Sequence, residues 1–250
     1  MSETAYELTH HGRSIVFDCP NAICLDRART VLTKEPGTIN WIDGFAPGEV
    51  FWDVGANVGV YSLYAAVMRD VTVLAFEPSA ANYHVLNRNI VANGLDRQVR
   101  ALCVALDRTL RLADLNMRSE EAGSARHTFG EAVDFRGRFD PAFLQASLGV
   151  SIDSLCSQFG APAPDHLKID VDGNEPAVVA GAANVLRTCR SVLVEMDLND
   201  AAEVREIASA FQAAGLVQDE NVVGNQVREH KGVRIYNMIF RRPEPGLTQI

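Results

Sequence analysis

The feature that most constrains this chain is the run Phe51-Trp52-Asp53-Val54-Gly55-Ala56-Asn57-Val58-Gly59-Val60-Tyr61. An apolar, strand-like segment ends in an acid, turns through two glycines and opens into a helical pattern. Glycine permits a tight turn and a close approach of a ligand to the backbone. The N-terminus of the following helix offers unpaired N–H groups. Such a unit is typical of an α/β sheet that holds a nucleotide-like cofactor at the carboxyl ends of its strands.

The glycine spacing argues against a dinucleotide. The dinucleotide fingerprint is G-x-G-x-x-G, and Asn57 stands here in the place of its middle glycine. The alternative without a ligand is a tight connection between strand and helix. Glu77 favours a ligand, because it ends the next apolar strand, 22 residues after Gly55. An acid there can accept hydrogen bonds from both ribose hydroxyls of a nucleoside; its alternative role is that of a solvated acid beside Pro78.

The rest of the chain repeats strand and helix patterns. Apolar strand-like runs occupy residues 50–54, 71–76, 99–106, 167–170, 191–195 and 234–241. Helical spacing lies between them at residues 58–68, 79–93, 151–159, 176–186 and 204–215. Continuous apolar strands that alternate with helices predict an α/β fold, in which helices cover both faces of a parallel sheet.

These patterns predict one cofactor-binding domain over residues 46–242. An N-terminal extension over residues 1–45, a hairpin turning at His11-Gly12 and then a helix, would pack on its core. Residues 243–250 resemble a loose tail. Residues 117–149 combine charges and glycines with little periodicity, which predicts a loop or lid.

Composition excludes several classes of protein. The formal net charge of −9 argues against nucleic acid as a partner, because phosphate binding needs clustered Lys and Arg. The first ten residues have no apolar signal core, and no apolar run approaches the roughly 18 residues that span a membrane. Five cysteines without a CxxC pair fit a reducing cytoplasm better than a disulfide framework. We therefore expect a cytoplasmic protein without a membrane span.

A second informative segment is Leu167-Lys168-Ile169-Asp170-Val171-Asp172-Gly173-Asn174-Glu175. Asp170 should emerge at the carboxyl end of a central strand, beside the glycine turn, with Asp172 two residues later. Acids next to a cofactor cleft can transfer protons. The alternative is that at least one of these acids caps the helix that starts near Pro176. Lys168 is expected to have a structural role.

A metal site and a histidine base are further alternatives. Asp170 and Asp172, together with Glu195-Met196-Asp197, could supply oxygen ligands for magnesium or calcium. Acids are common at strand ends and nothing resembles a dedicated metal loop, so a divalent metal is not expected. His127 is the histidine that we would test as a base, because it lies in the predicted lid; an ordinary surface histidine is the alternative.

Four segments together resemble the FkbM-type methyltransferases, a class I group that depends on S-adenosylmethionine. In chain order they are Phe51 to Tyr61, Phe76-Glu77-Pro78 with Asn82, Leu86 and Asn89, Ser151 to Leu155, and Leu167 to Glu175. The resemblance covers roughly residues 49–197. Its most specific part is the Lys-Ile-Asp-Val-Asp-Gly-Asn-Glu segment.

This resemblance implies a Rossmann-like fold with a seven-stranded, mostly parallel sheet, its last strand antiparallel and helices on both faces. It implies S-adenosylmethionine over the opening turn, with the ribose on Glu77, and S-adenosylhomocysteine as the product. Asp170 would lie near the methionine amino group or the transferred methyl. The other implied cofactor contacts are Asp53, Gly55, Asn57 and Gly59 around the methionine and ribose, and Val104 and Ala105 facing the adenine.

The resemblance also implies an acceptor, because FkbM-type enzymes act on hydroxyls of polyketides and sugars. We therefore expect O-methylation of a small-molecule or carbohydrate acceptor, with Asp170, Asp172 or His127 as the candidate catalytic residues. Asn116 and Gly123-Ser124 are similar to a lid motif of the family. Ala125-Arg126 departs from the small residue followed by leucine that usually continues this motif in the family, so the resemblance does not define the acceptor pocket. A nicotinamide-dependent oxidoreductase and a non-catalytic nucleoside-binding partner protein remain as alternatives, and a homodimer is one option for the oligomeric state.

Overall fold

The computed structural model describes residues 5–134, 136–225, 227–230 and 232–243, so nearly all of the predicted tail lies outside the described residues. At its centre seven strands follow the order β14-β16-β13-β12-β3-β4-β5. These strands are β3 (Val50–Val54), β4 (Thr72–Phe76), β5 (Val99–Leu102), β12 (His166–Ile169), β13 (Ser191–Asp197), β14 (Val217–Gln218) and β16 (Val233–Arg241). The strands from β13 to β5 pair in parallel, whereas β16 is antiparallel to β13 and β14. The predicted mostly parallel sheet, with its antiparallel last strand, is confirmed, although a short eighth strand also pairs with β16.

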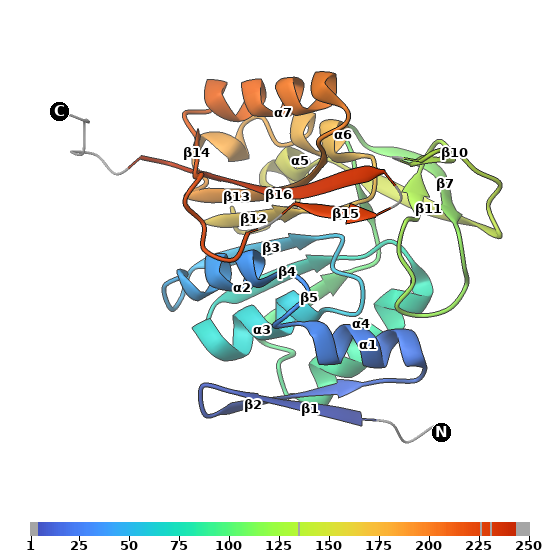
Figure 1. The fold of residues 1–250 in the computed structure, drawn as a ribbon, viewed down its shortest axis with the longest axis vertical. Helices are drawn as coiled ribbons and strands as arrows, with labels where there is room; N and C mark the ends of the chain where they lie inside the picture. Colours follow the sequence, from blue (N-terminus) through green and yellow to red (C-terminus); the bar gives the residue numbers. More distant parts are fainter. Residues whose placement is uncertain (1–4, 135, 226, 231, 244–250) are drawn as a thin grey trace.

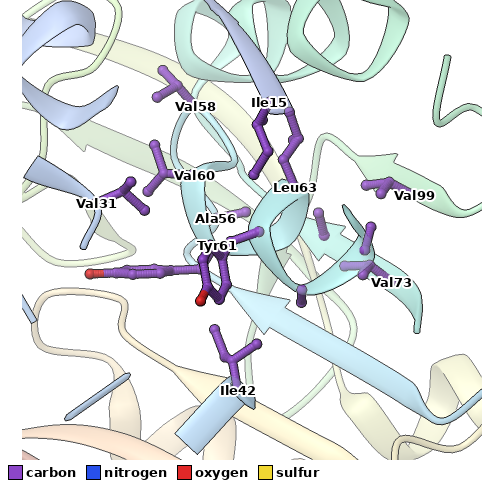
Figure 2. Packing of buried hydrophobic residues seen from close by; sticks show 14 of the residues in the cluster. Ile15, Val31, Ile42, Ala56, Val58, Val60, Tyr61, Leu63, Val73 and Val99 are labelled. Atoms are coloured by element: carbon purple, nitrogen blue, oxygen red, sulfur yellow. The ribbon is translucent and has the colours of Figure 1, made fainter. Parts of the chain in front are cut away.

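Each face of this sheet carries its own hydrophobic core. Phe51 packs on the side of α1 (Ala22–Thr30), α2 (Pro36–Asp43), α3 (Val60–Arg69) and α4 (Ala80–Ala92). The next residue, Trp52, packs on the side of α5 (Ile152–Phe159), α6 (Glu175–Ala180) and α7 (Ala201–Ala213). Successive strand residues face opposite ways, so apolar side chains are needed at both. Figure 1 shows α6 and α7 at one end of the view and α1, α3 and α4 at the other. Figure 2 shows the α3 side chains among residues of this first core.

The N-terminal segment forms the predicted hairpin, β1 (Ala5–His10) and β2 (Arg13–Asp18), followed by α1. His11 and Gly12 have φ of 48° and 75°, as a two-residue hairpin turn requires. The side chains of Asn89 on α4 and of Asn93, which caps the end of α4, accept the backbone N–H groups of Asp18 and Val16. The hairpin therefore lies on α4 and leads α1 toward the carboxyl ends of the central strands.

Residues 99–150 differ in two places from the prediction. The predicted strand 99–106 breaks after β5, and β6 (Ala105–Leu106) joins a second sheet of order β6-β11-β7-β8. Its other strands are β7 (Arg111–Met117), β8 (Thr128–Phe129) and β11 (Phe143–Val150). Within the predicted loop 117–149, residues 118–127 form a loop, whereas residues 143–149 form one strand of a hairpin arm. Leucines stay exposed on its outer face, among them Leu112 and Leu148. The usual alternation of apolar and polar residues is therefore missing from the sequence.

The described residues form three further short strands. β9 (Val133–Asp134) pairs with β10 (Gly137–Arg138), and β15 (Arg228–His230) pairs with β16. Across the described ranges, no helix has both the length and the apolar character that crossing a membrane requires.

Candidate active site

The turn between β3 and α3 holds three residues in the left-handed region. Gly55, Asn57 and Gly59 have φ of 81°, 52° and 84°. Asparagine adopts this conformation more readily than most residues, so Asn57 fits without a third glycine. A Cβ atom on Gly55 would lie 1.8 Å from the backbone oxygen of Asp170. Glycine is thus required there, because the turn after β3 passes directly over the end of β12.

Glu77 follows β4 and is buried against this turn. Its Oε2 accepts the backbone N–H of Asn57 at 2.8 Å, and its Oε1 accepts the backbone N–H of Ser79 at 2.8 Å. Burial raises the pKa of Glu77 to about 7, against the opposing effect of these hydrogen bonds. A carboxylate offers about four acceptor positions. Glu77 Oε1 also accepts a longer hydrogen bond from the side-chain amide of Asn82 at 3.4 Å, so about one acceptor position remains for a hydroxyl group of a ligand.

The end of β12 carries a buried ion-pair cluster. Lys168 Nζ lies 2.8 Å from Asp170 Oδ2 and 3.7 Å from Asp53 Oδ1, and its side chain is 1% exposed. Burial would raise the pKa of Asp170, but the charge and hydrogen bond of Lys168 outweigh it and lower this pKa to about 2. Burial would lower the pKa of Lys168, and the charges of Asp170 and Asp53 raise it instead. Asp170 is therefore a firmly ionised partner of Lys168 and a weak base.

The next two acids of the segment have different surroundings. Asp172 has a left-handed φ of 60°, and its Oδ2 accepts the backbone N–H of Arg126 at 2.7 Å. Burial and then the charge of Asp170 raise the pKa of Asp172 to about 6. Glu175 accepts the backbone N–H groups of Val171 and Gly173 at 3.0 and 2.8 Å. The capping interpretation thus fits Glu175, which ties down the turn before α6, whereas Asp172 faces the turn after β3.

A loop over residues 121–127 crosses above the glycine turn. The carbonyl of Ser124 accepts the side-chain amides of Asn57 at 2.7 Å and Asn82 at 3.1 Å. Asn82 Oδ1 in turn accepts the backbone N–H of Gly123 at 2.7 Å. The predicted lid residues Gly123 and Ser124 therefore lie on the turn, held by amides of the turn and of α4. Asn116 lies further away and donates to the carbonyls of Thr128 and Gly130.

His127 is oriented as a hydrogen-bond donor. Its Nδ1 accepts the backbone N–H of Arg118 at 3.2 Å, so the ring proton is on Nε2. Burial, with a smaller contribution from the charge of Arg27, lowers the pKa of His127 to about 4. The buried Nε2 has no hydrogen-bond partner in the described part of the chain. This geometry argues against His127 as a base and leaves a donor free for a ligand.

Three hollows adjoin at Gly55. The first, about 60 Å³, is lined by six of the predicted residues, namely Gly55, Asn57, Glu77, His127, Asp170 and Asp172. The second, about 30 Å³, is lined by Val104, Ala105 and other mainly apolar residues. The third, about 370 Å³, extends from Gly55 toward Arg27 of α1 and Arg228 of β15. Eight of the ten predicted site residues therefore surround one turn.

Asp53 and Gly59 line none of these three hollows. Asp53 is 1% exposed beneath the turn, where its Oδ2 accepts a hydrogen bond from Ser62 at 2.6 Å. A Cβ atom on Gly59 would lie 2.3 Å from Leu86 Cδ1, so this glycine permits the packing of α3 against α4. The predicted contact of these two residues with a cofactor stays a prediction.

Arg27 and Arg228 also line the third hollow, and no sequence motif predicted either residue. Arg228 of β15 lies 2.9 Å from Glu35 Oε1 and also pairs with Glu195, while Asn237 donates to Glu35 Oε2 at 3.0 Å. Arg27 of α1 donates to the carbonyl of Gly123. No local pattern marks these residues, because each contact joins segments that lie far apart in the sequence.

Three of the four acids that were considered as metal ligands are engaged with other groups. Asp170 pairs with Lys168 and Glu195 with Arg228, and Asp197 accepts the backbone N–H of Asn199. In the ranges that the structure covers, no three His, Cys, Asp or Glu side chains form a group that could hold a metal ion.

Comparison with known proteins identifies the family. The methyltransferase FkbM domain model matches residues 53–216. The 31-O-demethyl-FK506 methyltransferase FkbM of Streptomyces tacrolimicus is 27% identical over 231 residues, which cover 78% of this chain and 82% of that protein. The hexuronic acid methyltransferase AglP of Haloferax volcanii is 27% identical over 149 residues, which cover 59% of this chain and 56% of that protein.

A solved structure shares the fold. The putative rRNA methylase from Clostridium thermocellum has a TM-score of 0.51 at 7% identity, covering 84% of this chain and 96% of that one. At this identity the likeness concerns the fold alone. The family model, by contrast, spans well over half of this chain and includes the glycine turn, Glu77 and the acids after β12. The chain belongs to the FkbM methyltransferase family.

Proposed function

We propose that this protein transfers a methyl group from S-adenosylmethionine to a hydroxyl oxygen of a small-molecule or carbohydrate acceptor, with Asp172 as the proton acceptor. The contrast between the two acids after β12 carries this proposal. Asp170 is held by Lys168 at 2.8 Å and has a lowered pKa. Asp172 accepts a single backbone N–H and has a pKa raised to about 6. A group with a pKa near the working pH is the more effective base.

The residues around the turn fit the cofactor. Glu77 has acceptor capacity for a ribose hydroxyl, and the hollow beside Val104 and Ala105 offers an apolar surface to an adenine ring. The unpartnered Nε2–H of His127 lies between these two hollows and would donate to the bound nucleoside. A buried donor without a partner carries an energetic cost that a ligand would relieve. His127 is therefore assigned to binding rather than to proton transfer.

S-adenosylmethionine supplies, when bound, a methyl group that its sulfonium already activates. The task of the chain is then to align the acceptor oxygen, exclude water and take up a proton. The loop over residues 121–127 covers the turn and shields it from solvent. Asp172 accepts the proton of the acceptor hydroxyl, which becomes acidic as its oxygen is methylated. Asp170, held by Lys168, packs against Gly55 and so supports the turn after β3. Positioning alone can supply several kcal/mol of the rate enhancement.

The relatives support the acceptor class. One is named for a methyl transfer to an oxygen of a demethylated FK506, and another for hexuronic acids. Both names denote oxygen-rich small molecules or carbohydrates. The third hollow, about 370 Å³ beside Asp170 and Asp172, offers space for a group of that kind.

The test has two stages. Calorimetry with S-adenosylhomocysteine and with NADH comes first, and tight binding of NADH alone would overturn the methyltransferase proposal. Methyl transfer from labelled S-adenosylmethionine to a library of hydroxylated acceptors follows, with the D172N and D170N variants side by side. We expect Asp172→Asn to lower turnover at least 100-fold at unchanged affinity for S-adenosylhomocysteine.

The outcomes separate the remaining alternatives. If both variants retained wild-type turnover and normal cofactor affinity, neither acid would be the base. If the protein bound S-adenosylhomocysteine but methylated no acceptor in a broad library, a non-catalytic nucleoside-binding partner would be favoured.

A further inference from the structure

The third hollow is rich in positive side chains, although the chain as a whole has a net charge of −9. Arg27 comes from α1, Lys34 from the segment before α2, Arg126 from the loop above the turn and Arg228 from β15. Three regions far apart in the sequence, namely residues 27–34, Arg126 and Arg228, therefore contribute cations to one hollow. Asp170, Asp172 and Glu195 are the acids on the same wall.

Two of these cations serve the fold. Arg228 pairs with Glu35 and Glu195, and Lys34 Nζ lies 3.4 Å from Glu35 Oε1. Their charges are thus balanced by buried carboxylates. The arrangement fixes the segment before α2 against β15 and needs no ligand.

The other two cations have no such partner. Arg27 donates through Nε to the carbonyl of Gly123, which places its guanidinium over the loop. Within the described ranges, neither Arg27 nor Arg126 has a carboxylate within 4.0 Å. A guanidinium matches carboxylate and phosphate groups with two parallel hydrogen bonds. Both side chains are therefore available to an anion.

Arg126 is the better placed of the two for an acceptor. Its backbone N–H donates to Asp172 Oδ2 at 2.7 Å, so the side chain starts next to the proposed base. Its φ of 62° lies in a region that non-glycine residues adopt at an energetic cost, as often found at functional sites. Arg126 also lines both the first and the third hollow, at the junction of the cofactor side and the acceptor side.

We propose that the methyl acceptor carries an anionic group, a carboxylate or a phosphate ester, near its reacting hydroxyl, and that the guanidinium of Arg126 binds this group. This inference rests on the proposed function. Lys168 already compensates Asp170, and a bound sulfonium would add positive charge beside Arg126. Asp172 supplies one negative charge there, and an anionic acceptor would supply a second to match the guanidinium groups of Arg27 and Arg126, which a neutral acceptor does not. Arg126 thereby selects the acceptor without touching the transferred methyl.

The test compares matched acceptors and matched variants. Glucuronate with glucuronamide, and glucose 6-phosphate with glucose, differ in the anionic group and separate carboxylate from phosphate recognition. The variants are Arg126→Gln, Arg126→Lys and, as a control, Arg138→Gln. Arg138 lies on β10 with a side chain that is 75% exposed. Thermal unfolding shows that each variant is folded, and calorimetry shows that it still binds S-adenosylhomocysteine.

We expect the wild type to prefer one charged member over its neutral partner at least tenfold in kcat/KM. Arg126→Gln should reduce that preference to about twofold or less through KM, since one charge-assisted contact corresponds to roughly ten- to hundredfold. Arg126→Lys should retain most of it, and Arg138→Gln all of it. Affinity for S-adenosylhomocysteine should stay within twofold throughout.

Three results would overturn the proposal. In the first, the neutral acceptors are methylated as well as the charged ones. In the second, Arg126→Gln weakens S-adenosylhomocysteine binding tenfold, which assigns the guanidinium to the cofactor carboxylate. In the third, calorimetry on the protein with bound S-adenosylhomocysteine shows that neither glucuronate nor glucose 6-phosphate binds better than its neutral partner. This last readout does not need turnover, so it is distinct from a failure of the proposed function.

Discussion

Gly55→Ala probes the point where the turn after β3 meets the end of β12. The added Cβ atom would lie 1.8 Å from the Asp170 backbone oxygen, and these atoms must separate by about 1.6 Å to reach 3.4 Å, an ordinary contact. The backbone φ of 81° is itself unfavourable for alanine, by roughly 1–2 kcal/mol. Relieving the overlap within a packed region adds roughly 1–3 kcal/mol. We expect a loss of about 2–5 kcal/mol in the free energy of unfolding.

Gly48→Ala is a matched control. Gly48 has a φ of 83°, and a Cβ atom there would meet nothing within 4 Å. This variant has the backbone cost without the overlap, so it should lose about 1–2 kcal/mol. Urea unfolding of both variants isolates the overlap, and calorimetry measures S-adenosylhomocysteine affinity. Displacement of Asp170 and Asp172 should weaken that affinity at least tenfold in Gly55→Ala and leave it unchanged in Gly48→Ala.

The reasoning would be refuted if the two variants unfolded within about 0.5 kcal/mol of each other and bound S-adenosylhomocysteine equally. Such a result would mean that the β12 end moves away freely. The close approach at Gly55 would then have no role in holding the acids beside the turn.

Three further perturbations test the site. Burial and the charge of Asp170 raise the pKa of Asp172 to about 6. If Asp172 is the base, the rate of methyl transfer at saturating substrate should rise about tenfold per pH unit below pH 6 and level off above pH 7. A rate that stays constant from pH 5 to 8, with methyl transfer as the rate-limiting step, would contradict this role. Glu77→Gln removes a charged acceptor and should weaken S-adenosylhomocysteine binding roughly ten- to hundredfold by calorimetry, whereas unchanged affinity would exclude the ribose contact. Lys168→Met leaves the buried Asp53 and the partly exposed Asp170 without their cation and should lower the free energy of unfolding by about 3–5 kcal/mol at pH 7. Because Lys168 lowers the folded-state pKa of Asp170, its stabilisation is present above about pH 4 and is lost as the pH falls toward 2. The difference in the free energy of unfolding between wild type and Lys168→Met, measured with urea, should therefore shrink in acid. A difference that does not change with pH would argue against an ion pair between Lys168 and Asp170.

The cofactor side could be predicted from sequence because each of its parts is local. Gly55, Glu77 and Asp170 each follow directly after an apolar strand, and parallel strands bring their carboxyl ends to one edge of the sheet. Strand pattern and turn chemistry were therefore enough to place them together. Gly59 has a conformation that suits a ligand turn, and Leu86 fills the space where its side chain would be, so its predicted contact with a cofactor stays a prediction. A sequence motif does not distinguish a glycine that faces a ligand from one that faces a packed helix.

The hairpin arm escaped prediction for a different reason. Its strands β7 and β11 pair over seven residues each, from Arg111 opposite Gly149 to Met117 opposite Phe143. One face keeps exposed leucines, so the sequence shows neither clean alternation nor a continuous apolar run. Likewise β14, with two residues, is too short to leave a pattern. These elements are specified by pairing with distant strands rather than by their own periodicity.

The acceptor side is built from contacts that no motif encodes. Arg27 reaches the loop at Gly123, Arg228 reaches Glu35, and Arg126 stands where the sequence departs from the family pattern. The two sides of the site meet at Gly55 and Asp170, which line both the first and the third hollow. Residues that define the cofactor side are constrained by strand ends and a close backbone approach, whereas Arg27 and Arg126 are side chains on a helix and a loop. On the proposed function, substitutions at these two positions should change which acceptor binds while the turn, Glu77 and the Lys168–Asp170 pair stay in place.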